Sequence, residues 1–514
     1  MKTAGHDYGI QKLATGIQGF DLISLGGLPK GRTTLLTGTA GSAKTVIAAQ
    51  FLAEGVKQAG ENGVFVTFEE SPRDIRQNMA GLGWDIGKWE SEGRWVFVDA
   101  SLQPEQEEVI AGSYDFSALL SRIEHAIAST GARRVAMDSL GAVFTQYHDR
   151  SIVRRELFRL ASALKRIGVT ALLTSERTQE HGEISRYGVE EFVADNVIIV
   201  RNALEAEKRR RTIEILKYRG ALHQKGEYPF TIVPGKGAVV IPLSAMELKQ
   251  KSSNVRITSG NDDIDQMCGG GFFRDSIILV SGATGTGKTL MASQFLHSGT
   301  LNNERCLFFG FEESREQLFR NAAGWGINFH QMEQRGLIKV VADYPEVMGL
   351  EDHLLRMKKH LDDFRPDRVV VDSLSALERV ATLKGFREFI VGLTSFIKHQ
   401  EVAGFFTSTT PTLMGGTSIT EAHISTITDS IILLRYVELF GAMRRSLTVL
   451  KMRGSRHDKD IREFTIDDRG MHIGKPFRDV SGIISGHPTC TISPQEMEHL
   501  GSLYGIGSSD SANT

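Results

Sequence analysis

The sequence contains few of the features that mark secreted, disulfide-bonded or membrane-spanning proteins. Only three of its 514 residues are cysteine (Cys268, Cys306 and Cys490), and their spacing fits no zinc-binding pattern, so a reducing cytoplasm is the expected compartment. No apolar run approaches the roughly 18 residues of a membrane-spanning helix, and the first residues lack the apolar core of a signal peptide. With a formal net charge of -2, the chain has no general attraction to nucleic acid or to an anionic membrane.

The residues that are abundant are those of an ordinary globular protein, with 41% hydrophobic and 24% charged residues. At roughly 150 residues per domain, the length allows two to four domains. Four motifs occur twice in the same order, and this repeat predicts two large domains. They are a glycine-rich loop, a Phe-Glu-Glu-Ser step, an apolar segment ending in Asp-Ser, and a Lys-x-Arg-Gly segment.

Each glycine-rich loop has the composition of a phosphate-binding loop. The first runs Gly38-Thr-Ala-Gly-Ser-Ala-Lys-Thr45 and the second Gly282-Ala-Thr-Gly-Thr-Gly-Lys-Thr289. Glycines let backbone N–H groups surround phosphates, the lysine neutralises the β- and γ-phosphates, and the threonine hydroxyl binds Mg²⁺. The first loop has Ala43 where the pattern has glycine, which costs about 1 kcal/mol if the position needs a positive φ. We expect a working site of altered geometry there; an inactive relic is the alternative.

Acidic residues follow apolar segments in both copies. A Glu-Glu pair comes after one such segment, where one carboxylate can orient a metal and the other can polarise an attacking hydroxyl. The Asp-Ser step ends the next segment, as a Walker B aspartate does. A Glu-Glu pair alone is usually a solvated turn, but its repetition favours catalysis. The candidate catalytic residues are Glu69, Glu70, Glu312 and Glu313, and the candidate metal ligands are Thr45, Asp138, Thr289, Glu312 and Asp372.

A Lys-x-Arg-Gly segment lies late in each copy, beyond the last strands that the apolar pattern predicts. It contains Lys217 and Arg219 in the first copy, and Lys451 and Arg453 in the second. A cation on such a hairpin can reach the phosphate bound to a neighbouring subunit as an arginine finger. A surface hairpin with ion pairs is the alternative. The repetition, with a histidine and a lysine following at the same spacing, favours the finger.

One difference between the copies concerns hydroxyl groups. Their second halves align with a shift of 234 residues (191 to 425), which places Glu191 and Phe192 opposite Ser425 and Thr426. Paired hydroxyls that could accept phosphate therefore occur at this place only in the second copy. The same stretch, Ile-Ser-Thr-Ile-Thr, also suits a β-strand. The residues alone leave phosphorylation and an ordinary strand both open.

Strand, loop and helix signals alternate along both copies. Short apolar runs such as Val64–Phe68 and Val369–Val371 suit strands of a sheet covered on both faces, and helices are expected after the phosphate loops. The alternation predicts α/β domains, each with a mostly parallel central sheet flanked by helices. We expect the first domain at residues 1–246, the second at 247–500, and a disordered tail at 501–514 that is rich in Gly, Ser, Asp and Asn.

Together these motifs resemble the KaiC family of circadian clock proteins. The resemblance covers about residues 10 to 492 and includes Arg186-Tyr-Gly-Val-Glu-Glu-Phe192 and His423-Ile-Ser-Thr-Ile-Thr-Asp429. It implies two tandem RecA-like P-loop NTPase domains, stacked as two rings in a homohexamer with ATP and Mg²⁺ between subunits. It further implies a slow ATPase in the first ring and a serine/threonine autokinase and autophosphatase in the second. Ser425 and Thr426 would then be the phosphoacceptors and Glu312 the general base.

The loops, the Lys-x-Arg segments and the resemblance together give the candidate ATP-binding residues. Trp325 is included because it matches a nucleotide-contacting aromatic residue of the family; otherwise it would be an ordinary core residue. In the first copy the candidates are Gly38, Gly41, Ser42, Ala43, Lys44, Thr45, Lys217, Tyr218, Arg219 and His223. In the second copy they are Thr284, Gly285, Thr286, Gly287, Lys288, Thr289, Leu290, Trp325, Arg445, Lys451, Met452, Arg453, His457 and Lys459.

Two alternatives stand beside a KaiC-like timing enzyme. One is a signalling scaffold in which ATP only holds the ring together. The other is a DNA motor, which needs an extended basic strand-binding surface; the Lys208–Arg211 cluster is too short for one, so no nucleic-acid partner is expected. Residues around Glu108 to Leu120 resemble the family's KaiB-binding region, which favours a KaiB-like partner. The tail after Thr491 does not resemble the tail that recruits KaiA, which argues against KaiA binding.

Overall fold

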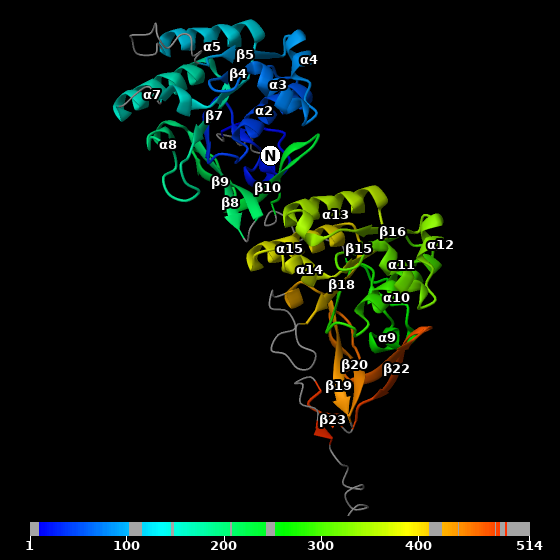
Figure 1. Cartoon of the computed structure of the whole chain (residues 1–514). Coiled ribbons are helices and arrows are strands. Elements are labelled where there is room, and N and C mark those ends of the chain that lie inside the picture. Colours follow the sequence, from blue (N-terminus) through cyan, green and yellow to red (C-terminus); the bar gives the residue numbers. More distant parts are fainter. Residues whose placement is uncertain are drawn as a thin grey trace, which may run out of the picture. The chain divides into compact units, whose positions relative to one another are not determined.

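The computed structural model describes residues 10–101, 116–144, 149–205, 208–242, 252–410, 424–439, 441–478, 480–483 and 489–490. The chain forms two compact units, Met1–Glu247 and Leu248–Thr514, each built on a nine-stranded sheet (Figure 1). The tail at 501–514 and most of the segment expected to bind a KaiB-like partner lie outside the described residues. Among the described helices, none is long and apolar enough to cross a membrane.

The sheet of the first unit has the strand order β11-β10-β9-β8-β3-β7-β6-β4-β5. The six strands β8, β3, β7, β6, β4 and β5 run parallel to one another. Strands β9, β10 and β11 continue the sheet in antiparallel fashion. Strand β3 lies in the middle of this order, and the phosphate loop follows it. The bounds are β3 Thr33–Gly38, β4 Gly63–Thr67, β5 Trp95–Asp99, β6 Arg134–Asp138, β7 Thr170–Glu176, β8 Asn196–Glu205, β9 Lys208–Tyr218, β10 Glu227–Val233 and β11 Gly237–Val240.

The second unit repeats this arrangement in the order β16-β15-β17-β18-β14-β19-β20-β21-β22. Its strands are parallel from β16 to β19 and antiparallel from β20 onward. The predicted α/β fold with a mostly parallel sheet is confirmed in both units. The bounds are β14 Ile277–Gly282, β15 Cys306–Gly310, β16 Ile338–Ala342, β17 Arg368–Asp372, β18 Ala403–Thr409, β19 Ser430–Leu439, β20 Ala442–Met452, β21 Arg462–Asp467 and β22 Gly470–Pro476.

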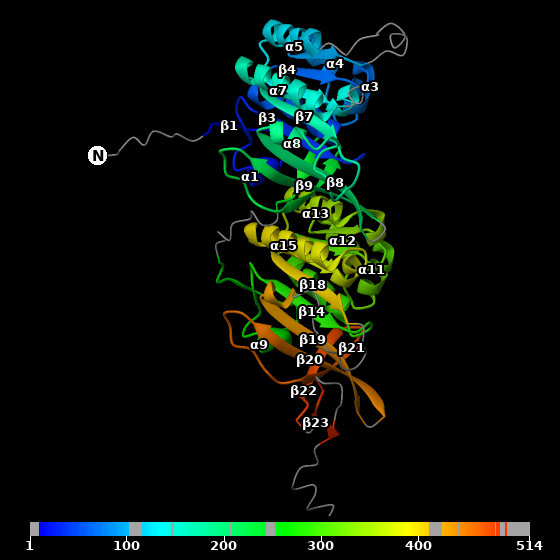
Figure 2. The ribbon, with the colours of Figure 1, turned by 90° about the vertical axis from the view of Figure 1, so that its left-hand side faces the viewer.

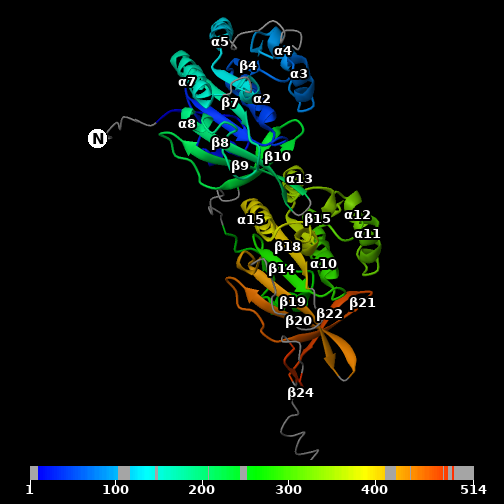
Figure 3. The same ribbon diagram turned by 60° about the vertical axis from the view of Figure 1, so that its left-hand side comes forward.

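Helices cover both faces of each sheet, as the apolar strands require. In the first unit, α2 (Lys44–Glu54), α3 (Pro72–Ala80) and α4 (Ile86–Ser91) share one apolar core with the sheet, whereas α5 (Phe116–Thr130) and α7 (Arg150–Ile167) share the other. Figures 1 and 3 show the corresponding layers of the second unit, with α10, α11 and α12 on one face and α13 and α15 on the other. Their bounds are α10 Lys288–Leu301, α11 Arg315–Ala323, α12 Phe329–Gln334, α13 Leu350–Phe364 and α15 Leu383–His399.

Short elements complete the two units, and several of them are labelled in Figure 2. In the first unit they are β1 Lys12–Leu13, α1 Phe20–Ile23, β2 Leu28–Pro29, the π-helix η1 Gly55–Ala59, α6 Leu140–Phe144 and α8 Glu190–Val193. In the second they are β12 Arg256–Ile257, α9 Asp262–Met267, β13 Phe272–Phe273, the 3-10 helices η4 Pro345–Val347 and η5 Ile424–Thr426, α14 Leu374–Glu378, β23 Val480–Ser481 and β24 Thr489–Cys490.

One expectation about local structure is wrong, and one alternative that the sequence left open is excluded. The Lys-x-Arg segments do not lie beyond the sheet, because Lys217 is in β9 and Lys451 in β20, which extend the sheet through antiparallel pairing with β8 and β19. The segment with the paired hydroxyls is not a strand either. It forms the 3-10 helix η5, and the Lys451 ammonium binds the carbonyl oxygens of Ser425 and Thr428, which a strand would use in its ladder.

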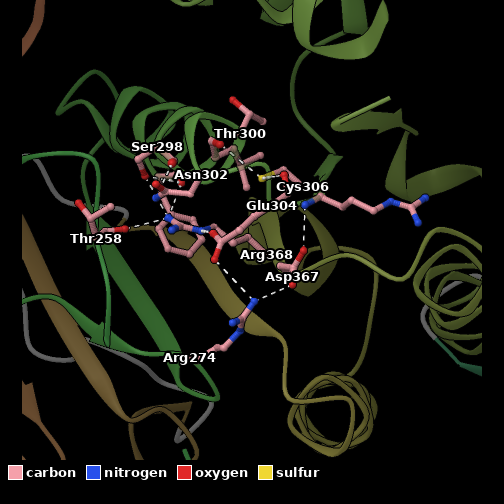
Figure 4. Close-up of polar contacts among 12 residues, drawn as sticks. Thr258, Arg274, Ser298, Thr300, Asn302, Glu304, Cys306, Asp367 and Arg368 are labelled. Carbon is pink, nitrogen blue, oxygen red and sulfur yellow. Dashed lines mark hydrogen bonds and ion pairs between the residues drawn. The ribbon is translucent and has the colours of Figure 1, made fainter. Parts of the chain in front are cut away.

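A buried arginine anchors the start of the strand that ends in the Asp-Ser step. Arg368 is 1% exposed, and its Nε donates to Glu304 Oε2 at 2.5 Å (Figure 4). Its Nη1 donates to the carbonyl oxygens of Thr258 and Phe295, each at 2.8 Å. In the first unit Arg134 has the same role, with Nε 2.7 Å from Glu61. Because several donors of each buried guanidinium have acceptors, the desolvation cost is offset and the strand is fixed in register.

Candidate nucleotide-binding sites

The two phosphate loops have the same backbone shape although their sequences differ. Each leaves the carboxyl end of the central strand and ends at the first residue of a helix, Lys44 of α2 or Lys288 of α10. The Lys44 ammonium donates to the carbonyl oxygens of Gly38 and Thr39, both at 3.0 Å. The Lys288 ammonium makes the equivalent two bonds at 2.9 Å. Burial lowers the pKa of both lysines, so each is a desolvated cation at a helix N-terminus, the place where phosphate binds.

Ala43 adopts the left-handed conformation that the loop requires. Its φ is 68°, and Gly287 at the same place in the second loop has a φ of 103°. The position therefore needs a positive φ, and the alanine there is strained. A Cβ on Gly287 would lie 2.7 Å from Cδ1 of Ile466, so the second loop also has less room for a side chain there. The first loop thus tolerates a side chain at the cost of backbone strain, whereas an alanine in the second would add the same kind of strain and displace the flexible end of Ile466.

The aspartates of the Asp-Ser steps lie next to the phosphate loops. Asp372 Oδ2 accepts a hydrogen bond from Thr289 Oγ1 at 2.7 Å, so the two candidate ligands of the second unit are in contact. Burial raises the pKa of Asp372, and hydrogen bonds from Thr407 and Thr289 oppose this shift. Asp138 in the first unit likewise accepts from Thr174. The structure thus brings the aspartate into contact with the loop threonine in the second unit, and with a threonine of the neighbouring strand in the first.

The Glu-Glu pairs divide between two different partners, and the division is the same in both units. Ser139 Oγ donates to Glu69 at 3.0 Å, and Ser373 Oγ donates to Glu312 at 2.8 Å. The second glutamate of each pair accepts instead from an asparagine in the helix that follows, α3 or α11. These bonds are Asn78 to Glu70 at 3.3 Å and Asn321 to Glu313 at 3.1 Å.

Helix capping explains the serine of the Phe-Glu-Glu-Ser step. Ser71 and Ser314 are N-caps of α3 and α11, and each accepts a hydrogen bond from the backbone N–H three residues on. The cap starts the helix directly after the two glutamates and so fixes their direction. Burial raises the pKa of Glu69, Glu70 and Glu313, as expected for carboxylates at a partly desolvated site.

The Lys-x-Arg cations bind the segment that carries the paired hydroxyls. Lys451 Nζ donates to the carbonyl oxygen of Ser425 at 2.6 Å, and Arg453 Nη2 donates to that of Thr426 at 2.6 Å. Arg453 also lies 3.5 Å from Asp429. In the first unit, Lys217 holds the carbonyl oxygen of Glu191 at 3.0 Å in the same way.

This segment lies at the amino ends of the parallel strands, whereas the phosphate loop of the same unit lies at their carboxyl ends. Strands β14 and β19 are parallel, with Ile278 beside Ser430 and Gly282 beside Leu434. The phosphate loop continues from Gly282, whereas η5 precedes Ser430. Asp429 confirms the placement, because its carboxylate accepts from the N–H of Ile277 at 2.9 Å.

Comparisons with known proteins agree with this architecture. A family model described as "ATPase: KaiC" matches residues 13–245 and 257–477. The chain belongs to the KaiC ATPase family. "Circadian clock protein KaiC3" of Synechocystis sp. is 67% identical over 496 residues, which cover 96% of this chain and 98% of that protein. "Circadian clock oscillator protein KaiC" of Thermostichus vulcanus is 55% identical over 491 residues, covering 96% and 94%. The protein of that name from Synechococcus elongatus is 55% identical over 480 residues, covering 93% and 92%.

Membership of the KaiC family confirms the predicted resemblance and the two ATP-using domains. The remaining candidate residues differ in what they offer a nucleotide. Leu290, Tyr218 and Met452 are buried in the core, so mainly their backbone is available. Trp325 is partly buried and packs against the core of its unit, so its role as a nucleotide-contacting residue stays a prediction. The side-chain partners Thr174, Thr407, Asn78 and Asn321 were not predicted, since threonine in a strand and asparagine in a helix have no distinctive spacing.

Proposed function

We propose that this KaiC-family ATPase is a serine/threonine autokinase and autophosphatase as well as a slow ATP hydrolase. ATP would bind at both phosphate loops, and the second site would phosphorylate Ser425 and Thr426. The phosphoacceptors would belong to the adjacent subunit of a homohexamer. The placement of η5 at the edge of the sheet opposite the phosphate loop carries this proposal.

The strand geometry argues against transfer within one subunit. Four residue steps separate Ile278 from Gly282 along β14, and each step rises about 3.3 Å, so phosphate loop and acceptor are more than about 13 Å apart. Phosphoryl transfer needs reacting atoms about 3 to 3.5 Å apart. If a neighbouring subunit places its η5 beside the phosphate loop of this subunit, the acceptor and the bound ATP can come within reach of each other. Lys451 and Arg453 would arrive with the acceptor, because they are bonded to it.

The chemistry assigns a role to each side chain of the second site. The acceptor hydroxyl oxygen bonds to the γ-phosphorus of ATP while the bond to the β,γ-bridging oxygen breaks and ADP departs. Glu312 takes the hydroxyl proton, and Glu313 polarises the same site from the other side. Lys288 and the arriving Arg453 offset the negative charge that develops on the phosphoryl oxygens.

The first site would only hydrolyse ATP. Glu191 and Phe192 stand where the second unit has Ser425 and Thr426, so no hydroxyl is offered at that place. Water is then the acceptor, and Glu69 and Glu70 orient and deprotonate it. The loop lysine is bonded as in the second site, which supports a working site despite Ala43.

The donor set next to the phosphate loops fits Mg²⁺. Asp372 and Thr289 present oxygen atoms, which are the ligands that Mg²⁺ prefers, and in such sites it is held by one or two carboxylates together with the phosphates. In the described part of the chain, no group of three potential metal-binding side chains occurs, which suits an ion completed by ATP and water. When bound, Mg²⁺ would neutralise charge on the β- and γ-phosphates. Thr45, Asp138, Thr289, Asp372 and Glu312 are the residues that would hold or orient it.

The printed names of the relatives support a role in timekeeping. We propose a circadian or related timing function with a KaiB-like partner on the first unit, in the cytoplasm. A scaffold held together by ATP is the second candidate, and it differs in predicting no turnover. Intact mass and peptide mapping after incubation with Mg·ATP separate the two. We expect phosphate on Ser425 and Thr426 and none in the Ser425→Ala/Thr426→Ala double variant. Undiminished phosphorylation of that variant would refute the proposal.

A further inference from the structure

A completely buried threonine lies beside the Asp-Ser aspartate in both units. Thr174 is in β7, between the phosphate-loop strand β3 and the aspartate strand β6; Thr407 has the same place in β18, between β14 and β17. Both threonines are 0% exposed, and the residues immediately before them in the strand are apolar and buried. Valine would fill the same space and pack better, because a buried hydroxyl is costly unless it is hydrogen-bonded.

The hydroxyl of each threonine donates to the aspartate of the neighbouring strand, and the Thr407 hydroxyl also lies 3.5 Å from the carbonyl oxygen of Val371. Thr174 Oγ1 donates to Oδ1 of Asp138, and Thr407 Oγ1 donates to Oδ1 of Asp372. With Oδ1 of Asp372 held in this way, Oδ2 faces Thr289 of the phosphate loop at 2.7 Å. The same contact in two units that have diverged at their loops and acceptors is a second, independent instance of the arrangement.

We propose that Thr407 is a positioning residue that fixes the Asp372 side chain with Oδ2 toward Thr289, so that Asp372 and Thr289 form a preorganised half-site for a divalent cation, and that Thr174 holds Asp138 for the same purpose in the first unit. The inference rests on the proposed role of Asp372 and Asp138 as metal ligands. Without this hydrogen bond the aspartate side chain would populate other rotamers. The ion would then bind only the fraction of molecules in which Oδ2 points toward the loop threonine. Removing the hydroxyl should therefore weaken binding of the ion and leave the chemical step intact once the ion is bound.

The direct test measures Mn²⁺ binding by electron paramagnetic resonance in the full chain loaded with a non-hydrolysable ATP analogue. Because the full chain has two proposed cation sites, the comparison changes only the second unit and reads the effect against the unchanged first site: Thr407→Val, Thr407→Ser and Asp372→Asn. We expect Thr407→Val to weaken Mn²⁺ binding about tenfold and Thr407→Ser, which keeps the hydroxyl, to stay within about twofold of the wild type. Raising the Mg²⁺ concentration should restore phosphorylation in Thr407→Val.

The variants separate failure of this inference from failure of the proposed function. Wild-type Mn²⁺ affinity in Asp372→Asn would mean that the aspartate is no ligand, which overturns the proposed metal site. Weak binding in Asp372→Asn with wild-type binding in Thr407→Val would overturn the positioning role alone. If Thr407→Val does not fold by circular dichroism, Thr174→Val and Thr407→Cys, whose thiol is a weak donor, decide the question by the same criteria.

Discussion

Replacing Ala43 with glycine should stabilise the first unit. Ala43 has φ 68° and ψ 30°, a left-handed conformation that costs a residue with a Cβ about 1 to 2 kcal/mol. Glycine removes this strain but loses about 0.4 to 1 kcal/mol through the greater freedom of the unfolded chain. The expected net gain is about 0.5 to 1 kcal/mol in the free energy of unfolding. The reciprocal change, Gly287→Ala, adds strain and a 2.7 Å contact with Ile466, and should cost about 1 to 3 kcal/mol.

Hydrogen–deuterium exchange with peptide resolution can measure each unit separately in the full chain. Under conditions in which α2 and β3 exchange through global opening, Ala43→Gly should slow their exchange about two- to fivefold, and peptides of the second unit should be unchanged. Gly287→Ala should speed exchange in α10 and β14 only. Faster exchange in Ala43→Gly, or no effect of Gly287→Ala, would refute the account of backbone strain at this loop position.

Two further perturbations test a buried arginine and a partly desolvated glutamate. Arg368→Met should destabilise the second unit by about 3 to 5 kcal/mol, because Glu304 keeps only its longer ion pair with Arg274 and the buried carbonyl oxygens of Thr258 and Phe295 lose their donor. Arg478→Ala, which breaks an exposed ion pair, should change stability by less than about 1 kcal/mol in the same urea titration. Glu70→Gln should raise the melting temperature of the nucleotide-free protein near pH 7. The raised pKa of Glu70 means that the folded state binds the proton more tightly, so stability falls as pH rises above the ordinary value for glutamate. The advantage of the variant should shrink on acidification, and a constant difference would contradict the assignment.

The sequence predicts the parts of the fold that depend on local pattern. The order of loop, Glu-Glu pair, Asp-Ser strand and Lys-x-Arg segment is sufficient to predict two α/β units, because each motif follows an apolar strand whose period and length are visible. The apolar pattern places the Lys-x-Arg segments beyond the sheet because the antiparallel extension by β9 and β20 is not visible in it. At η5, a tertiary contact overrides local propensity. Lys451 binds the carbonyl oxygens around Ser425, and this stabilises a 3-10 helix in a stretch with strong β-propensity.

Side-chain partners across the sheet are beyond the reach of sequence pattern. Thr407 lies 35 residues from Asp372, and Ser373 lies 61 residues from Glu312. Only the strand order, with β18 between β14 and β17, brings Thr407 to the aspartate. The same holds for the acceptor edge, since the parallel register of β14 and β19 determines that η5 and the phosphate loop are at opposite ends.

Transfer between subunits is the central claim, and mixed hexamers test it most directly. Glu312→Gln keeps the acceptors but lacks the proposed base, and Ser425→Ala/Thr426→Ala keeps the base but lacks the acceptors. The two are exchanged into mixed assemblies with ATP and Mg²⁺, and phosphate is mapped by mass spectrometry on isotope-labelled Glu312→Gln chains. If transfer occurs between subunits, the labelled Glu312→Gln chains, which are nearly unphosphorylated alone, should gain phosphate on Ser425 and Thr426 in the mixture. Labelled chains that remain unphosphorylated in verified mixed hexamers would contradict it.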